Sequence, residues 1–209
     1  MASGIVPNLF KEAMIHPTYK GQWKDPREPG SYRPIAILTA LSKVLEVAVR
    51  EALLSWFNHI GFLPESQFGF RPGRSVKMAL SVAQNEWVLA KSKKDVVAVM
   101  AFDLSWAFDT IEHANLLSKL NSGGISGTPL KWFDSYLKNC TQSVLWNSIM
   151  SSSRSINRGV PQGTILGPIL FLAMIHDMPK ILKRVSAPSS SSMTGSVNIK
   201  SKNLKNVTS

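Results

Sequence analysis

Asp103 combines a residue type and a position that could serve catalysis. It follows the apolar run Val96–Phe102, so a carboxylate stands where a buried strand is expected to end. A carboxylate held rigidly at a strand end can bind a divalent cation. Two such cations can bring a hydroxyl against a phosphate and neutralise the charge that develops. The same pattern also fits an ordinary turn aspartate, so the position alone leaves both interpretations open.

A glycine-punctuated loop lies further along the chain. The segment Arg158–Pro168 carries Gly159, Gly163 and Gly167 directly before an apolar, helix-like run. Glycine lets backbone approach a ligand closely, and the N-terminus of a helix offers amides to negative charge. We therefore expect an anion-binding loop, although such a loop taken alone is a weak signal.

Basic and aromatic residues stand at two other places. Lys20 and Arg33 flank a loop rich in proline, glycine and charge, and each is also compatible with a solvated surface cation. A second group precedes a helix that Ser75 can cap; it consists of Phe70, Arg71 and Arg74. Guanidinium groups beside aromatic rings suit nucleic-acid backbones and bases, but a capped turn is the plainer alternative.

Composition narrows the class of protein. The 209 residues are 44% hydrophobic, enough for one sizeable core or part of a larger fold. The net charge is +11, and residues 135–209 carry nine lysines and arginines against one aspartate, which favours a nucleic-acid partner over a merely basic protein. The single cysteine, Cys140, excludes an internal disulfide. With no signal peptide or membrane-length apolar run, we expect an intracellular chain, nuclear or cytoplasmic, that is neither secreted nor membrane-bound.

Hydrophobic periodicity and turn residues predict a mixed α and β chain. The expected elements, in order, are a short helix ending near Met14, strands 15–19 and 32–38, a helix over 41–60 capped by Thr39 or Ser42, a helix after Ser75, a central strand over 96–102, a helix from about 112 to 123, a helix capped by Thr128, a hairpin of 141–147 with 153–157, and a helix from 163 to about 183. The serine-rich, basic residues 186–209 are expected to be disordered.

Two segments in this order and spacing resemble core motifs of a known family. Phe-Asp-Leu-Ser-Trp-Ala-Phe-Asp at 102–109 and Arg-Gly-Val-Pro-Gln-Gly-Thr-Ile-Leu-Gly-Pro at 158–168 are similar to motifs of the reverse transcriptases of non-LTR (LINE-like) retrotransposons, a class of transposable element. Residues 17–20, 31–35, 67–75 and 111–113 also resemble family motifs. The similarity covers about residues 5–180.

The resemblance implies an RNA-directed DNA polymerase, a nucleotidyltransferase that needs Mg²⁺ and acts with an RNA template, a DNA primer and deoxynucleoside triphosphates. No protein partner is implied. Catalytic Asp103 would bind metal together with the carbonyl of Leu104, while Asp109 would be structural. The nucleotide-binding residues would be Lys20 and Arg33 on the triphosphate, Phe108 beneath the sugar, and Gln162 with Gly163. The residues contacting nucleic acid would be Phe70, Arg71, Arg74 and Arg158.

The implied fold is α+β, a right-hand polymerase. Residues 1–94 would form a fingers-like region and residues 95–185 a partial palm, an antiparallel sheet backed by helices, followed by the tail 186–209. Trp106 stands where the family usually has lysine, and His176 where asparagine is usual.

The Tyr-x-Asp-Asp motif of the family is absent from the 209 residues. We therefore expect a domain truncated before that motif and joined to foreign or frame-shifted sequence. Its two-metal site would be incomplete, and the isolated chain would be inactive. The alternatives are a non-catalytic nucleic-acid-binding remnant and a pseudogene product.

Overall fold

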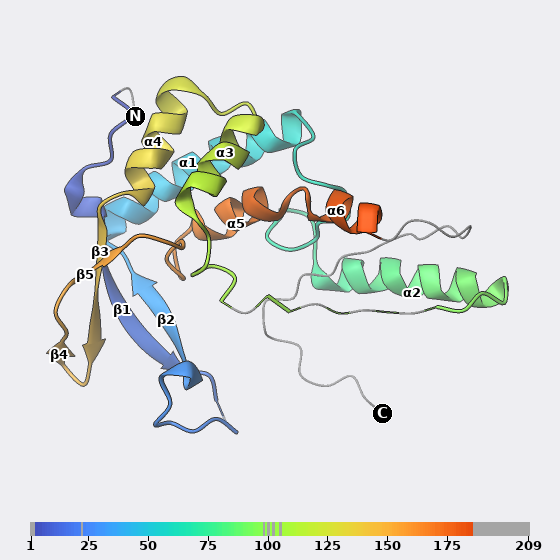
Figure 1. Cartoon of the computed structure of the whole chain (residues 1–209), viewed down its shortest axis with the longest axis horizontal. Helices are drawn as coiled ribbons and strands as arrows, with labels where there is room; N and C mark the ends of the chain where they lie inside the picture. The colour runs from blue at the N-terminus through green and yellow to red at the C-terminus, as the bar shows by residue number, and fades with distance from the viewer. Residues whose placement is uncertain are drawn as a thin grey trace. The chain divides into compact units, whose positions relative to one another are not determined.

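The computed structural model describes residues 3–21, 23–97, 99, 101, 103–104 and 106–185, and the predicted disordered tail 186–209 lies outside them. The chain forms two compact units (Figure 1). The first unit combines Met1–Ile60 with Phe108–Met174, and the second combines Gly61–Ala107 with Ile175–Ser209. The predicted division into fingers and palm at residue 94 stays a prediction.

The first unit contains a five-stranded, mostly antiparallel sheet in the order β2-β1-β3-β4, with β5 also paired to β3. The strands are β1 Glu12–Tyr19, β2 Tyr32–Ile37, β3 Cys140–Trp146, β4 Ile149–Met150 and β5 Arg154–Ile156. Only the pairing of β1 with β3 is parallel. The predicted α+β class is therefore confirmed as a mixed fold with one mostly antiparallel sheet.

The two faces of β1 and β2 carry different residues. Ala13, Ile15 and Ala36 are buried on one face, where they form a small apolar cluster. Arg33 stands opposite Thr18 in the antiparallel register and therefore belongs to the other face. The hairpin between β3 and β4 turns at Asn147 and Ser148, both with positive φ, as a type I′ turn requires.

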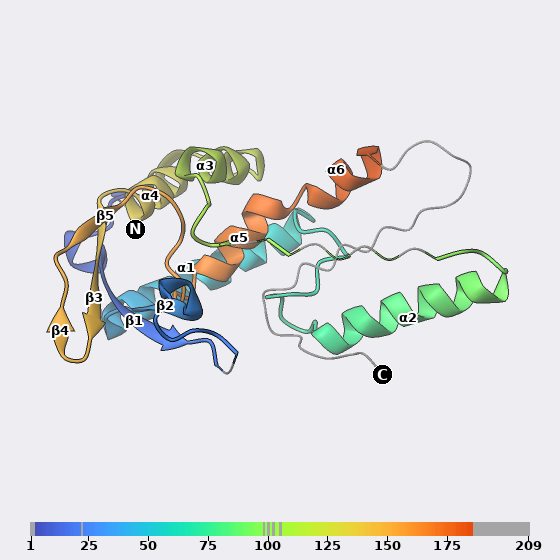
Figure 2. The ribbon, with the colours of Figure 1, turned by 60° about the horizontal axis from the view of Figure 1, so that its bottom comes forward.

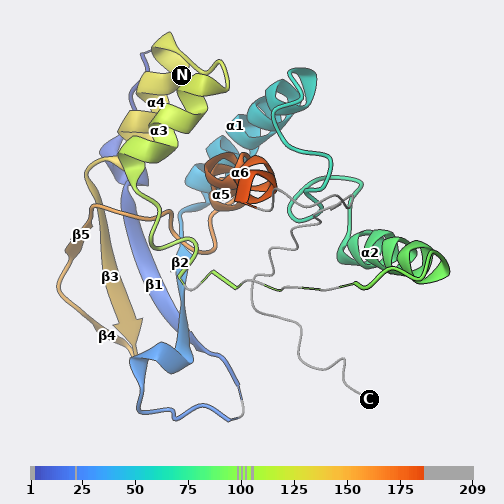
Figure 3. The same cartoon turned by 45° about the vertical axis from the view of Figure 1, so that its right-hand side comes forward.

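Four helices accompany this sheet in the first unit. They are α1 Ala40–His59, α3 His113–Ser122, α4 Gly127–Leu137 and α5 Gly167–Ile175, whose last residue belongs to the second unit. In Figures 1 to 3, α3 lies beside α4 and α5 lies beside α1. The predicted cap of α1 is confirmed, because Thr39 accepts a hydrogen bond from the Ser42 amide at 3.2 Å. Residues 166 and 169–173 are all buried, which makes α5 a core helix.

The second unit contains the helices α2 Val76–Ser92 and α6 Met178–Val185 and the loop that leads into α2. Ser75 caps α2 as predicted, with its hydroxyl accepting from the Met78 amide at 3.2 Å. Two short 3₁₀ turns, Asn8–Phe10 and Pro29–Ser31, belong to the first unit. None of the helices in the described part of the chain is long and apolar enough to cross a membrane.

The predicted central strand over 96–102 is wrong for its described residues. Val96, Val97 and Val99 are not in a strand, and 98% of the Val96 surface is exposed. A strand persists only when a neighbour accepts and donates its backbone hydrogen bonds. No described residue pairs with this segment, so its apolar run alone does not make a strand.

Three further boundaries differ from the prediction. The helix expected to end near Met14 is only a 3₁₀ turn, because β1 already begins at Glu12 and pairs with strands on both sides. Helix α4 starts after Ser126 rather than at Thr128. The helix expected from Gly163 to Lys183 is instead a loop followed by α5 and α6, because Gly163 has a φ of +98° that no helix adopts.

Candidate nucleotide-binding site

The loop before α5 is anchored to the segment that follows the predicted metal-binding motif. The Gly159 amide donates to Ile111 at 2.7 Å, and the Val160 amide donates to Phe108 at 2.9 Å. A Cβ on Gly159 would lie 2.8 Å from the Cα of Asp109, and its φ is +84°, so only glycine fits here. The Nε2 of His113 lies 2.8 Å from the Gly159 carbonyl oxygen, to which it donates. His113 therefore helps to anchor the loop to the start of α3.

The same loop also lies along strand β2. The Ala36 amide donates to the carbonyl of Gln162 at 2.6 Å. A Cβ on Gly163 would come within 2.9 Å of the Ala36 carbonyl oxygen. The glycines therefore let the loop approach the protein's own backbone closely. As a result, Gln162 and Gly163 lie next to β2, the strand that carries Arg33.

Gln162 makes a side-chain contact with Asp109. Its Nε2 donates to Oδ2 of Asp109 at 2.9 Å. Burial raises the pKa of the half-buried Asp109 carboxyl, while the Gln162 hydrogen bond and the positive charge of Lys20 act to lower it. Lys20, at the end of β1, is therefore close enough to act on Asp109, and its Nζ donates to the Gly30 carbonyl at 2.6 Å.

Phe108 is half-buried, and its ring lies against Phe171 of α5. The ring centroids are 5.0 Å apart, with the planes tilted by 38°. This contact is typical of an ordinary core phenylalanine. Its role beneath a sugar stays a prediction.

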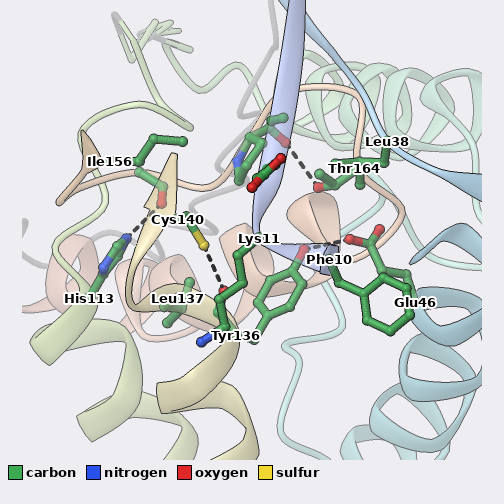
Figure 4. Close-up of a pocket in the computed structure, with 14 residues that line it drawn as sticks. Phe10, Lys11, Leu38, Glu46, His113, Tyr136, Leu137, Cys140, Ile156 and Thr164 are labelled. Carbon is green, nitrogen blue, oxygen red and sulfur yellow. Dashed lines mark hydrogen bonds between the residues drawn. The ribbon is translucent and has the colours of Figure 1, made fainter. Parts of the chain in front are cut away.

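The amides at the start of α5 are occupied by a residue that the sequence did not single out, Glu46, whose side chain is drawn in Figure 4. Glu46 of α1 is 2% exposed, and its Oε2 accepts from the amides of Ile165 at 2.6 Å and Leu166 at 3.3 Å. Thr164 supplies the next acceptor, for the Gly167 amide at 2.9 Å. The expectation that these amides are open to a phosphate is therefore wrong. The available signal was a glutamate on the helix face that also carries Val49 and Leu53.

Tyr136 completes the contacts of Glu46 by donating to its Oε1 at 2.6 Å. Burial, followed by the negative charge of Glu46, raises the pKa of Tyr136 well above its usual range, so the hydroxyl keeps its proton and remains a donor. Nearby is a cavity of about 30 Å³, lined among others by Lys11, Cys140 and Tyr136 (Figure 4). That volume suits a water molecule and excludes a nucleotide. Burial also raises the pKa of Cys140, against the opposing charge of Lys11, as expected for an inert thiol.

Asp103 and Leu104 lie in the second unit, exposed and outside any strand. The strand that was to hold Asp103 rigidly is missing among the described residues. Within this described part of the chain, no three carboxylate, histidine or cysteine side chains are grouped closely enough to hold a metal ion. The donor set therefore does not fit the two-metal site that the resemblance implied.

The predicted nucleic-acid-binding residues are divided between the two units. In the second unit, Arg71 donates to the Pro64 carbonyl at 3.0 Å, and Arg74 forms an ion pair with Glu65 that lowers the pKa of that carboxyl. Both arginines thus stabilise the loop before α2. Phe70 is 45% exposed with a positive φ, and Arg158 is exposed in the first unit.

Comparison with known proteins identifies the family. The family described as reverse transcriptase (RNA-dependent DNA polymerase) matches residues 20–195. The chain belongs to the reverse transcriptase family. Its relatives include the probable RNA-directed DNA polymerase from transposon X-element of Drosophila melanogaster, 34% identical over 171 residues that cover 80% of this chain and 18% of that protein.

Two other relatives fit the same assignment. The RNA-directed DNA polymerase from mobile element jockey of D. melanogaster is 32% identical over 84% of this chain and 19% of its own length. The group II intron-encoded protein LtrA of Lactococcus lactis is 28% identical over 72% of this chain and 23% of its own length. The X-element and jockey matches agree with the non-LTR retrotransposon kind of reverse transcriptase. This reverse transcriptase chain spans about a fifth of the length of these relatives.

Proposed function

We propose that this chain is the part of a non-LTR retrotransposon reverse transcriptase that binds the incoming deoxynucleoside triphosphate. One observation carries the proposal: the predicted nucleotide-binding residues all lie in the first unit, although the chain between them is long. They are Lys20, Arg33, Phe108, Gln162 and Gly163. The anchoring of residues 159–163 to both β2 and the 108–111 segment is the physical basis of this gathering.

Each residue has a role that suits its chemistry. Lys20 offers a point charge and Arg33 a planar fork to the phosphates. Gln162 and Gly163 approach the nucleotide from the loop, and Phe108 limits the space beneath the sugar. We also propose that the chain is part of a right-hand polymerase fold, with residues 1–94 as fingers and residues 95–185 as a partial palm.

Nucleic acid is the second proposed ligand, as RNA template and DNA primer. The net charge of +11 favours attraction to phosphates at long range. Phe70 offers an exposed ring, and Arg158 an exposed cation, at the surfaces of the two units. Arg71 and Arg74 would shape the loop that presents Phe70.

RNA-templated DNA synthesis is proposed for the whole protein, with Asp103 and the Leu104 carbonyl on the metal. Because the described donor set does not fit two metal ions, we expect no primer extension by this chain alone. Extension on an RNA template that is lost on Asp103→Asn would contradict that expectation. Its absence, together with retained binding, would favour the non-catalytic nucleic-acid-binding remnant for this chain.

Nucleotide affinity tests the proposal directly. Equilibrium dialysis with radiolabelled dTTP should show binding that weakens on Lys20→Ala and on Arg33→Ala. Lys43→Ala, an exposed cation of α1, is the matched control and should bind as the parent does. If the parent chain binds no dTTP, or if both substitutions leave the affinity unchanged, the proposed site is wrong.

A further inference from the structure

Gln162 is held at both ends. Its main-chain carbonyl accepts from Ala36 at 2.6 Å, and its side-chain Nε2 donates to Asp109 at 2.9 Å. The backbone of Asp109 is in turn packed against Gly159 at a separation that admits no side chain on the glycine. Backbone contacts therefore fix the main chain of Asp109 against the loop, within hydrogen-bonding reach of the Gln162 side chain.

The chemistry of this pair fixes which way the amide of Gln162 points. An ionised carboxylate only accepts hydrogen bonds, whereas a glutamine amide has an accepting oxygen and a donating NH₂ group. With Asp109 ionised, the NH₂ group must face Asp109. The carbonyl oxygen Oε1 then points away from Asp109 and is the acceptor that Gln162 offers to another molecule.

We propose that Asp109 is a positioning residue that orients the Gln162 amide, so that Gln162 presents its carbonyl oxygen to a hydrogen-bond donor on the nucleotide. This inference rests on the proposed function for the identity of the ligand. It differs from the structural role that the resemblance gives Asp109, because a merely structural aspartate would not control which end of the Gln162 amide faces outward.

Protonation of Asp109 should release this control. A protonated carboxyl can donate, so the amide of Gln162 could reverse and accept from it. Among the described residues, Lys20 is the charged group that acts on Asp109; Gln162 and the Gly159 backbone, which also pack against it, are uncharged. The orientation should therefore follow one titration, modulated by Lys20.

A spectroscopic experiment on the full chain tests the orientation. The NH₂ resonances of Gln162, assigned by their loss in Gln162→Leu, are followed by NMR from about pH 7 down through the range of carboxyl titration, about pH 4. They should shift with a single midpoint above that of an ordinary aspartate. Asp109→Asn should abolish this titration, while the control Asp134→Asn, at a half-buried aspartate of α4 that is paired with Lys138, should leave it intact. Resonances that ignore both pH and Asp109→Asn would overturn the proposal.

Binding of dTTP at neutral pH supplies the functional arm. Asp109→Asn, which can both donate and accept, and Asp109→Leu, which can do neither, should each lower the affinity by about three- to tenfold, the size of one well-placed hydrogen bond. Asp109→Glu should recover part of it. Unchanged affinity in both variants would overturn the positioning role. If even the parent binds no dTTP, the proposed function fails, and the NMR titration alone decides whether Asp109 holds the amide.

Discussion

Removing the Glu46 carboxylate should lower the free energy of unfolding of the first unit by more than the loss of one hydrogen bond would, because this carboxylate accepts several. Glu46→Ala would leave three donors without an acceptor. They are the Ile165 amide and the Tyr136 hydroxyl, each 2.6 Å from the carboxylate, and the Leu166 amide at 3.3 Å. A buried donor without a partner costs about 1–3 kcal/mol. The longest of the three bonds is weak and such costs are not additive, so we expect a loss of about 3–5 kcal/mol.

Two milder variants separate the contributions. Tyr136→Phe removes one donor to the charged oxygen and should cost about 1.5–3 kcal/mol, the range of hydrogen bonds to charged groups. Glu46→Gln keeps the shape and can turn its carbonyl oxygen toward the two backbone amides while its NH₂ group donates to the Tyr136 hydroxyl, so it should retain much of the stability that Glu46→Ala loses. Glu51→Ala, an exposed glutamate on the same helix, is the matched control and should stay within about 0.5 kcal/mol.

Urea denaturation followed by circular dichroism gives the free energies of unfolding, and amide hydrogen exchange locates the change. Exchange at Ile165 and Leu166 should accelerate in Tyr136→Phe before the rest of the first unit does. A loss below about 1 kcal/mol in Glu46→Ala would refute the reasoning. It would mean that solvent reaches these amides and satisfies them when the carboxylate is gone.

Three further predictions concern Gly159, Asp109 and the binding of RNA. Gly159→Ala should lower the free energy of unfolding measured in urea by about 2–4 kcal/mol, because its Cβ would meet the Asp109 backbone at 2.8 Å and its φ is positive. At Gly30, an added Cβ would meet nothing within 4 Å, so Gly30→Ala should be tolerated. Equal effects of the two substitutions would contradict this. Burial raises the pKa of Asp109, so this carboxyl contributes stability below the ordinary aspartate pKa and loses it as pH rises through the raised value. Asp109→Asn should accordingly gain stability over the parent as the pH rises from about 4 to 7, and a difference independent of pH would argue against it. Binding to RNA should weaken steeply with salt, because phosphate contacts release counterions, and a filter-binding titration with a flat salt response would exclude a phosphate-driven interaction.

Features that depend on near neighbours in the chain were predictable. Thr39 and Ser75 cap α1 and α2 as expected, because an N-cap needs only the amides two or three residues ahead. The strand expected over 32–38 and the pairing expected between 141–147 and 153–157 likewise follow from local patterns, and they are observed as β2 and as the β3–β5 pair, while the short strand β4 was not expected. The order and spacing of the motifs also predicted the family, which the match over residues 20–195 confirms.

Features that depend on distant partners were not predictable in this way. Val96–Val99 has the composition of a central strand, but a strand also needs neighbours that composition cannot supply. The hydrogen bond from Ile165 to Glu46 joins residues 119 positions apart. The apolar face around Glu46 indicates that its carboxylate is buried, but it does not indicate which donors the carboxylate meets. The phosphate-binding expectation failed for that reason, since the acceptor for those amides comes from another helix of the same unit.

The contacts of the loop also determine which groups can recognise a nucleotide. The amides of Gly159, Val160, Ile165, Leu166 and Gly167 all donate within the protein, to backbone carbonyls, to Glu46 or to Thr164. Backbone amides at these positions therefore cannot be the main phosphate ligands without breaking internal hydrogen bonds. Under the proposed function, attraction for a triphosphate would therefore come mainly from side-chain cations, which makes Lys20 and Arg33 more important to the expected affinity than the glycine-rich appearance of the loop suggests. The glycines serve the fold, by letting the loop reach β2 and Asp109, and through that fold they place Gln162.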